Sequence, residues 1–132
     1  MNTDLINCLN FLKTNKPDIF NAIDFNGLSV SLHITFQFVL DNPTLSWNYN
    51  SLTIHPMVTW QTIIDNIEFP WNWTFVSLNP NITFDIIVDN PSYNWNLDNV
   101  SQNINLTWDI VNNNPEFPWN YMDIYTNFSS RN

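Results

Sequence analysis

The chain has 132 residues, of which 44% are hydrophobic and 16% aromatic, so it is long enough and apolar enough to fold around a core. Twelve Asp and Glu residues stand against three cations, Lys13, Lys16 and Arg131, which gives a net charge of -9. Because nucleic-acid and anionic-membrane binding depend on clustered cations, this balance excludes the first kind of partner and disfavours the second.

Residues 1–32 are expected to form a divergent helical cap. Thr3 and Asp4 are typical of a helix start, and apolar residues follow at helical spacing as far as Leu12. The Asn-Lys-Pro sequence at 15–17 ends this helix. A second helix is expected from about residue 18 to Gly27, the only glycine of the chain and a common helix stop.

Residues 33–128 are four copies of one 24-residue unit, aligned without a gap at 33–56, 57–80, 81–104 and 105–128. Four positions are identical in every unit. The first is a threonine, expected to be a helix N-cap: Thr35, Thr59, Thr83 and Thr107. The second is an asparagine: Asn42, Asn66, Asn90 and Asn114. The third is a tryptophan, expected in the core: Trp47, Trp71, Trp95 and Trp119. The fourth is another asparagine: Asn48, Asn72, Asn96 and Asn120. Residues 129–132 form a polar C-terminal end.

Each unit is expected to hold two short helices. In the third unit Thr83 caps the first helix, and Phe84, Ile87 and Val88 share one of its faces at i, i+3 and i+4. This helix ends at Asn90, because a residue before proline resists helical geometry.

The second helix of a unit is expected to begin at a proline where one is present. In the second unit Pro70 and Trp71 suit the first helical turn, since proline there loses no helical hydrogen bond. The helix would run through Leu78 and stop at Asn79, before Pro80.

Helices of two turns do not persist alone, because nucleation is costly. We therefore predict an all-α fold, with short helix pairs stacked as an α-solenoid of the right-handed type. Residues 84–89 also alternate in polarity as a β-strand does, and the length of the unit lies within the range of leucine-rich repeats. A β-solenoid is thus the alternative, although the leucine-rich spacing itself is absent.

Two rows of polar side chains are candidate binding residues. The first is an acidic edge, which is either solvated or able to hold a cation or a basic peptide: Asp41, Asp65 and Asp89. The second is the asparagine column that begins with Asn48, which either lines a groove or satisfies backbone groups between stacked units. Trp, Asn and Asp together also suit a carbohydrate-binding module, but the core position of the tryptophans weakens that hypothesis.

No residue pattern predicts catalysis, a cofactor or a metal site. The only histidines, His33 and His55, each replace another residue in a single unit, and no serine or cysteine motif accompanies them. Cys8 is the only cysteine, so an internal disulfide is excluded and its role stays open. Without a signal sequence or an 18-residue apolar run, we expect an intracellular protein with no membrane span.

Residues 79–87, Asn-Pro-Asn-Ile-Thr-Phe-Asp-Ile-Ile, and 70–73, Pro-Trp-Asn-Trp, resemble the NPNITWDIV and NPDKPWNW repeats of giant DNA virus proteins of the mimivirus type. The resemblance covers about residues 33–128. Some copies depart from it, because Ile67 and Ile104 stand where the motif has proline. The resemblance implies a viral protein of the host cytoplasm or the virion, and no defined activity.

These observations favour a non-enzymatic repeat scaffold that binds another protein, with a basic partner suited to its acidic body. The alternative is a structural component of a virus particle, in which the chain would pack against copies of itself or a coat protein. A carbohydrate-binding module or an enzyme is expected less.

Overall fold

The computed structural model describes residues 2–131, and every regular element in this range is a helix. The all-α prediction is therefore confirmed, and the β-solenoid alternative is wrong for residues 2–131. Met1 and Asn132, the outermost residues of the expected cap and polar end, lie outside the described range. Helices α1, α2 and α3 precede the units and span Asp4–Asn15, Pro17–Phe20 and Phe25–Leu28.

The first helix of each unit starts and ends at two of the identical positions. These helices are α4 (Phe36–Asp41), α6 (Trp60–Asp65), α8 (Phe84–Asp89) and α10 (Trp108–Asn113). A threonine caps each of them, its hydroxyl accepting a backbone N–H from the first turn, as Thr83 does from Ile86. Val88 was expected on the buried face, but it is exposed, whereas Ile87 is buried. A helix of six residues thus buries little more than one position.

The second helices each begin after the fourth identical position, which in the second unit is later than predicted. They are α5 (Tyr49–Thr53), α7 (Trp73–Val76), α9 (Leu97–Val100) and α11 (Tyr121–Ser129). The predicted start at Pro70-Trp71 and run through Leu78 are wrong, because α7 begins after Asn72 and ends at Val76. The backbone of Asn72 is extended, and its side-chain oxygen accepts the N–H of Thr74. An asparagine N-cap, rather than a proline, sets the start.

The N-terminal cap contains three helices instead of two. The second predicted helix is divided into α2 and α3, and Gly27 lies inside α3 with a negative φ, so its predicted role as a helix stop is wrong. Asp24 caps α3 by accepting the N–H of Gly27 at 3.0 Å. A Cβ at Gly27 would lie 2.6 Å from the Asp24 carboxylate, so a larger residue there would displace the capping side chain. Thr3 precedes α1, but Asn2 rather than its hydroxyl accepts the first N–H.

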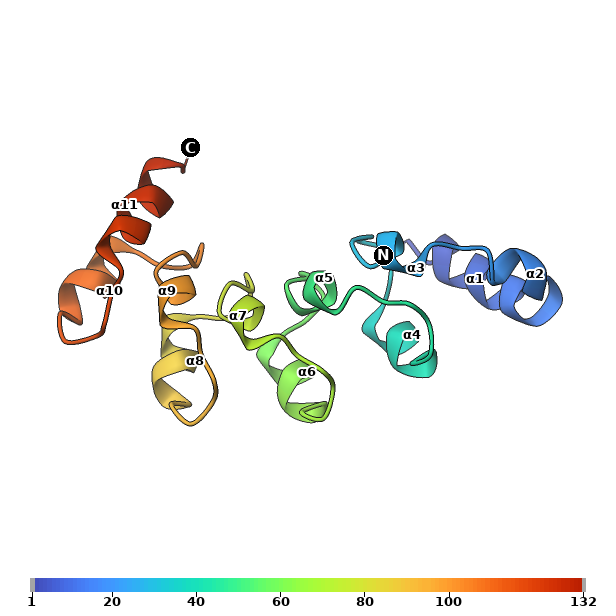
Figure 1. Ribbon diagram of the computed structural model, residues 1–132, viewed down its shortest axis with the longest axis horizontal. Helices are drawn as coiled ribbons and strands as arrows, with labels where there is room; N and C mark the ends of the chain where they lie inside the picture. The colour runs from blue at the N-terminus through green and yellow to red at the C-terminus, as the bar shows by residue number, and fades with distance from the viewer. Residues whose placement is uncertain (1, 132) are drawn as a thin grey trace.

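The helix pairs follow one another in a row, with α4, α6, α8 and α10 along one edge and α5, α7, α9 and α11 along the other (Figure 1). Two groups of buried residues form the core, one around the cap and first unit and one around the later units. Phe36, Met57 and Phe69 pack against both groups. The core is therefore continuous from α1 to α11.

Aromatic contacts join each unit to the next in the same way. The ring of Phe36 lies 5.2 Å from that of Phe69 and 5.5 Å from that of Trp71, both in the following unit. The equivalent contacts of Trp60 are with Tyr93 and Trp95, and those of Phe84 are with Phe117 and Trp119. Trp108 has the same position in the fourth unit and is 56% exposed.

Candidate binding surface

The tryptophan column is held by the asparagine column that ends the first helices. Trp47, Trp71 and Trp119 are buried, and Trp95 is half-buried. In every unit the indole N–H donates to the backbone carbonyl of that asparagine at 2.8 to 3.0 Å, as Trp95 does to Asn90. The asparagine side chain in turn donates to the carbonyl four residues earlier. The tryptophan and asparagine columns together therefore end the first helix of each unit and hold the loop that follows it.

The asparagine column proposed as a ladder also has a structural role. Asn48, Asn72, Asn96 and Asn120 each accept a backbone N–H from the first turn of a second helix. Two of them also reach the preceding unit: Asn72 donates to Asn50 at 2.8 Å and Asn120 to Asp98 at 3.4 Å. The side-chain oxygens of all four are thus engaged in caps, and two of the four also contact the preceding unit.

A buried hydroxyl column, which the sequence reasoning missed, joins successive units. Ser29, Thr53, Ser77 and Ser101 are completely buried. Each hydroxyl accepts the backbone N–H of the N-cap asparagine of the next unit, at 2.9 Å for Asn96 on Ser77. The signal was present in the sequence, since three units carry Thr or Ser at this position and Ser29 precedes Thr53 by the length of one unit. Residues 24–29 therefore correspond to 48–53, the N-cap and second helix of the first unit.

A second missed ladder runs through the asparagines found seven residues after the N-cap asparagine in three of the units. Asn79, Asn103 and Asn127 donate to backbone carbonyls of the preceding unit. His55 takes this place in the first unit: Nε2 lies 2.7 Å from the Ser31 carbonyl, and Nδ1 accepts the Met57 N–H. His55 is buried, whereas His33 is exposed and precedes α4. His55 is thus a ladder residue.

Arg131 bonds backbone carbonyls on both sides of the junction between the third and fourth units, as Asn81 and Asn105 do at the two earlier junctions. Asn81 and Asn105 each donate to two backbone carbonyls, those of Asn105 belonging to Pro80 and Ile82. The guanidinium of Arg131 reaches the equivalent carbonyls one unit later, Ile104 at 3.2 Å and Leu106 at 2.8 Å. Every buried side-chain N or O among residues 2–131 has a hydrogen-bond partner.

Within residues 2–131 the carboxylates of the acidic edge, unlike these asparagines and Arg131, make no hydrogen bond to another unit. Asp41, Asp65 and Asp89 are the last residues of α4, α6 and α8, and all three are exposed. Gln37 and Gln61 donate to the first two carboxylates from one turn earlier. These pairs support the helix, whereas an anion at a helix C-terminus is disfavoured by the helix dipole.

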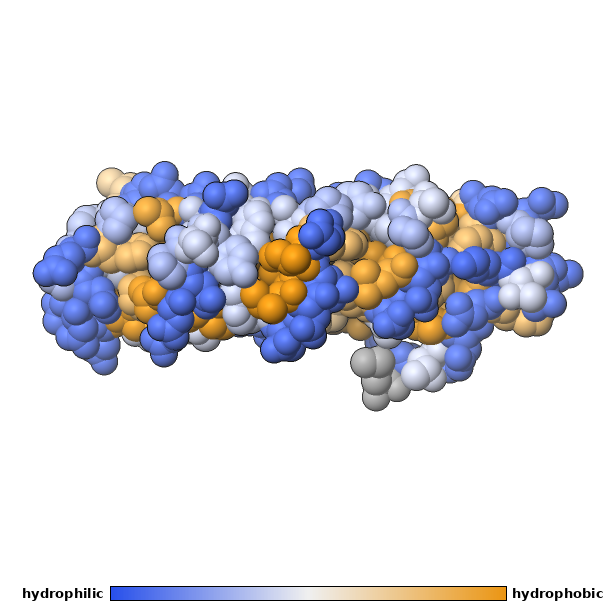
Figure 2. All heavy atoms as spheres, turned by 90° about the horizontal axis from the view of Figure 1, so that it is seen from below, coloured by the Kyte–Doolittle hydropathy of each residue, from blue (hydrophilic) through white to orange (hydrophobic). Residues whose placement is uncertain are grey.

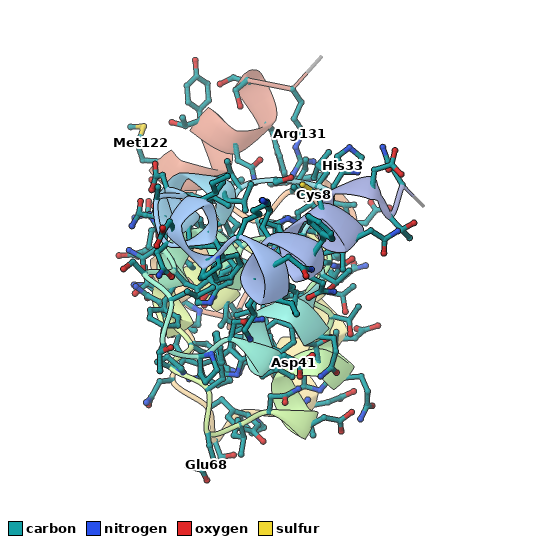
Figure 3. The ribbon with its side chains drawn as sticks, turned by 90° about the vertical axis from the view of Figure 1, so that its right-hand side faces the viewer. Cys8, His33, Asp41, Glu68, Met122 and Arg131 are labelled. Carbon is teal, nitrogen blue, oxygen red and sulfur yellow. The ribbon has the colours of Figure 1, made fainter. Side chains whose placement is uncertain are left out.

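An apolar row lies next to the acidic edge along the same helices. It is formed by the preceding residue in each unit, Leu40, Ile64 and Val88, and we call it the aliphatic stripe. Leu40 and Val88 are 36% and 45% exposed, and Ile64 is half-buried. Figure 2 looks onto the loops that follow the first helices, and apolar patches alternate there with hydrophilic ridges. In Figure 3 Asp41 and Glu68 lie toward this side, away from Cys8, His33 and Arg131.

Clustered metal ligands and membrane-spanning helices are both absent from the part of the chain that the structure describes. No group of three or more His, Cys, Asp or Glu side chains within residues 2–131 is arranged to hold a metal ion. Cys8 is an exposed free thiol on α1. Among the helices of this range, none combines the length and the apolar character needed to cross a bilayer.

Comparison of the chain with protein-family models, with curated protein sequences and with solved structures gave no match.

Proposed function

We propose that this protein is a non-enzymatic scaffold that binds a basic protein partner. The partner would lie along the first helices, where the acidic edge runs beside the aliphatic stripe. This juxtaposition carries the proposal, because the residues identical in all units are engaged in capping, core packing or contacts between units. Exposed carboxylates beside exposed aliphatic side chains are suited to a partner with both Lys or Arg and apolar residues.

Charge supports the same partner. Eleven carboxylates and no Lys or Arg occur between Pro17 and Ser130. The field of the stack therefore attracts cationic surfaces, and association should be faster and tighter at low ionic strength.

We further propose that the helix pairs continue as an α-solenoid of the right-handed type. The recurrence of the same hydrogen bonds between neighbouring units supports this, since equal contacts impose an equal rotation at each step. An origin in a giant virus is proposed from the repeat motif alone. Mass spectrometry of purified particles separates a scaffold of the infected cytoplasm from a stoichiometric particle component.

The binding proposal is tested with a fluorescein-labelled peptide of ten lysines, measured by anisotropy, with a peptide of ten glutamates as the negative probe. We expect binding of the lysine peptide that weakens steadily as salt rises. Replacing the acidic edge by Asp41→Asn, Asp65→Asn and Asp89→Asn together should weaken it about tenfold, since each exposed pair contributes roughly 0.2–1 kcal/mol.

The matched control removes three exposed carboxylates elsewhere, by Asp4→Asn, Asp18→Asn and Asp98→Asn. It changes the net charge equally and should weaken binding much less. Equal losses in the two triple variants would show that only net charge matters. Absence of lysine-peptide binding at low salt would refute the basic partner.

A further inference from the structure

The loops after the first helices repeat with a period of two units as well as one. Residues 68–72 of the second unit and 116–120 of the fourth are both Glu-Phe-Pro-Trp-Asn. The third unit has Ser92 and Asn94 in place of the glutamate and the proline. The first unit likewise has Thr and Ser at these two positions. The chain therefore carries two copies of a distinctive loop, separated by two unit lengths.

Each of these loops forms one wall of a cleft, and the aliphatic stripe of the preceding unit forms the other. Leu40 lies across from Glu68 and Phe69 in the first cleft, of about 450 Å³. Val88 lies across from Glu116 and Phe117 in the second, of about 380 Å³. Both glutamates are exposed, and both phenylalanines are half-buried. The two clefts thus share a glutamate beside an aliphatic and an aromatic surface, and the first also has Asp65 where the second has Asn113.

This chemistry fits one long cationic side chain. The methylene stem of Lys or Arg covers apolar surface while its charged head stays at the rim, within reach of a carboxylate. An aromatic ring under the head adds a cation–π attraction. The third unit does not reproduce the arrangement, because Ser92 carries no charge and Tyr93 stacks on Trp73 with ring centroids 5.0 Å apart.

We propose that the two clefts act together on a bivalent partner that places one Lys or Arg side chain in each. This inference rests on the proposed function and specifies it. Packed helices lie roughly 8–10 Å apart, so two units separate the clefts by roughly 20 Å. A partner with two cationic segments at this spacing binds the second cleft at a high effective concentration.

The test compares two synthetic peptides. The monovalent probe contains one Arg-Leu-Arg segment, and the bivalent probe contains two joined by a Gly-Ser linker of about 12 residues, whose reach is roughly 20 Å. Isothermal titration should show the bivalent probe binding at least about tenfold more tightly to the wild-type protein. Glu68→Gln and Glu116→Gln should each reduce the bivalent affinity to about the monovalent level.

The control variant is Asp98→Asn, which removes an equal charge from an exposed residue of α9, outside the acidic edge and both clefts. It should retain most of the bivalent gain. A bivalent probe that binds no better than the monovalent one, or an Asp98→Asn loss equal to that of Glu68→Gln, overturns the paired clefts. The ten-lysine peptide distinguishes the two failures, because its binding would still support the basic partner. Circular dichroism verifies that each exposed substitution leaves the helices intact.

Discussion

His55 shows how a single residue can depart from its column and still perform the column's structural role. Like the amide of Asn79 one unit later, its ring bonds one earlier carbonyl and accepts the N–H two residues on. The carbonyl is that of Ser31, two residues after the equivalent of Thr53, which Asn79 bonds. The ring is buried, so each group it satisfies would be costly to leave unpaired.

His55→Ala should therefore lower the free energy of unfolding by about 2–4 kcal/mol, because the Ser31 carbonyl and the Met57 N–H both lose their partner. His55→Asn restores the residue of the other units and should cost less than half as much. Urea denaturation followed by circular dichroism measures both. Equal losses for the two variants would mean that packing of the ring, rather than the ladder, determines the effect.

Short helices persist in this chain because both ends of each are fixed by side chains. A six-residue helix such as α8 leaves most of its backbone groups without a helical partner. The hydroxyl of Thr83 satisfies one N–H at the start, and Asn90 donates to the Ile86 carbonyl at the end. Stability thus comes from the caps and from contact with neighbouring units.

Thr83→Ala should lower the free energy of unfolding by about 1 kcal/mol, the usual cost of losing an N-cap. Thr83→Ser keeps the acceptor and should retain most of the stability. The control is Thr74→Ala, an exposed threonine inside α7, where alanine is the better helix former and a slight gain is expected. Thermal unfolding of the three variants measures these differences in stability. If Thr83→Ala matches the wild type, the cap contributes nothing.

The sequence was most informative about elements whose ends carry local signals. Thr83 and Asn90 enclose their helix in the predicted places, because capping depends on residues within one turn. The start of α7 was mispredicted, since Pro70 is also a valid helix start. In the structure the Trp71 indole instead bonds the Asn66 carbonyl, five residues earlier in the same loop, and Asn72 is the N-cap of α7.

The candidate binding surface could be predicted only where it depends on positions that recur along the sequence. A residue that recurs from unit to unit is compatible with either a binding role or a structural role. The hydrogen bonds show that Asn96 caps a helix and that Asn103 joins two units. The acidic edge was predictable, because Asp41, Asp65 and Asp89 recur at the same position of successive units. The clefts could not be predicted from the sequence, because Leu40 and Glu68 lie in different units and come together only when the units pack.

At the scale of the whole molecule, charge acts on folding and on binding in opposite ways. The carboxylates from the second helix of the cap to α11 have no Lys or Arg among them, so the stacked chain holds like charges closer together than the unfolded chain does. This self-repulsion destabilises the folded state. Added salt screens it, and the same salt weakens the attraction of a basic partner.

Raising NaCl from about 10 mM to about 150 mM shortens the Debye length from roughly 30 Å to roughly 8 Å. We expect the melting temperature to rise by about 3–5 °C, which corresponds to roughly 1 kcal/mol for a domain of this size. Lysine-peptide affinity should fall over the same range. The variant with Asp41→Asn, Asp65→Asn and Asp89→Asn should be more stable at about 10 mM NaCl and respond less to salt. A melting temperature that falls with salt would mean that unpaired carboxylates do not limit the stability of the stack.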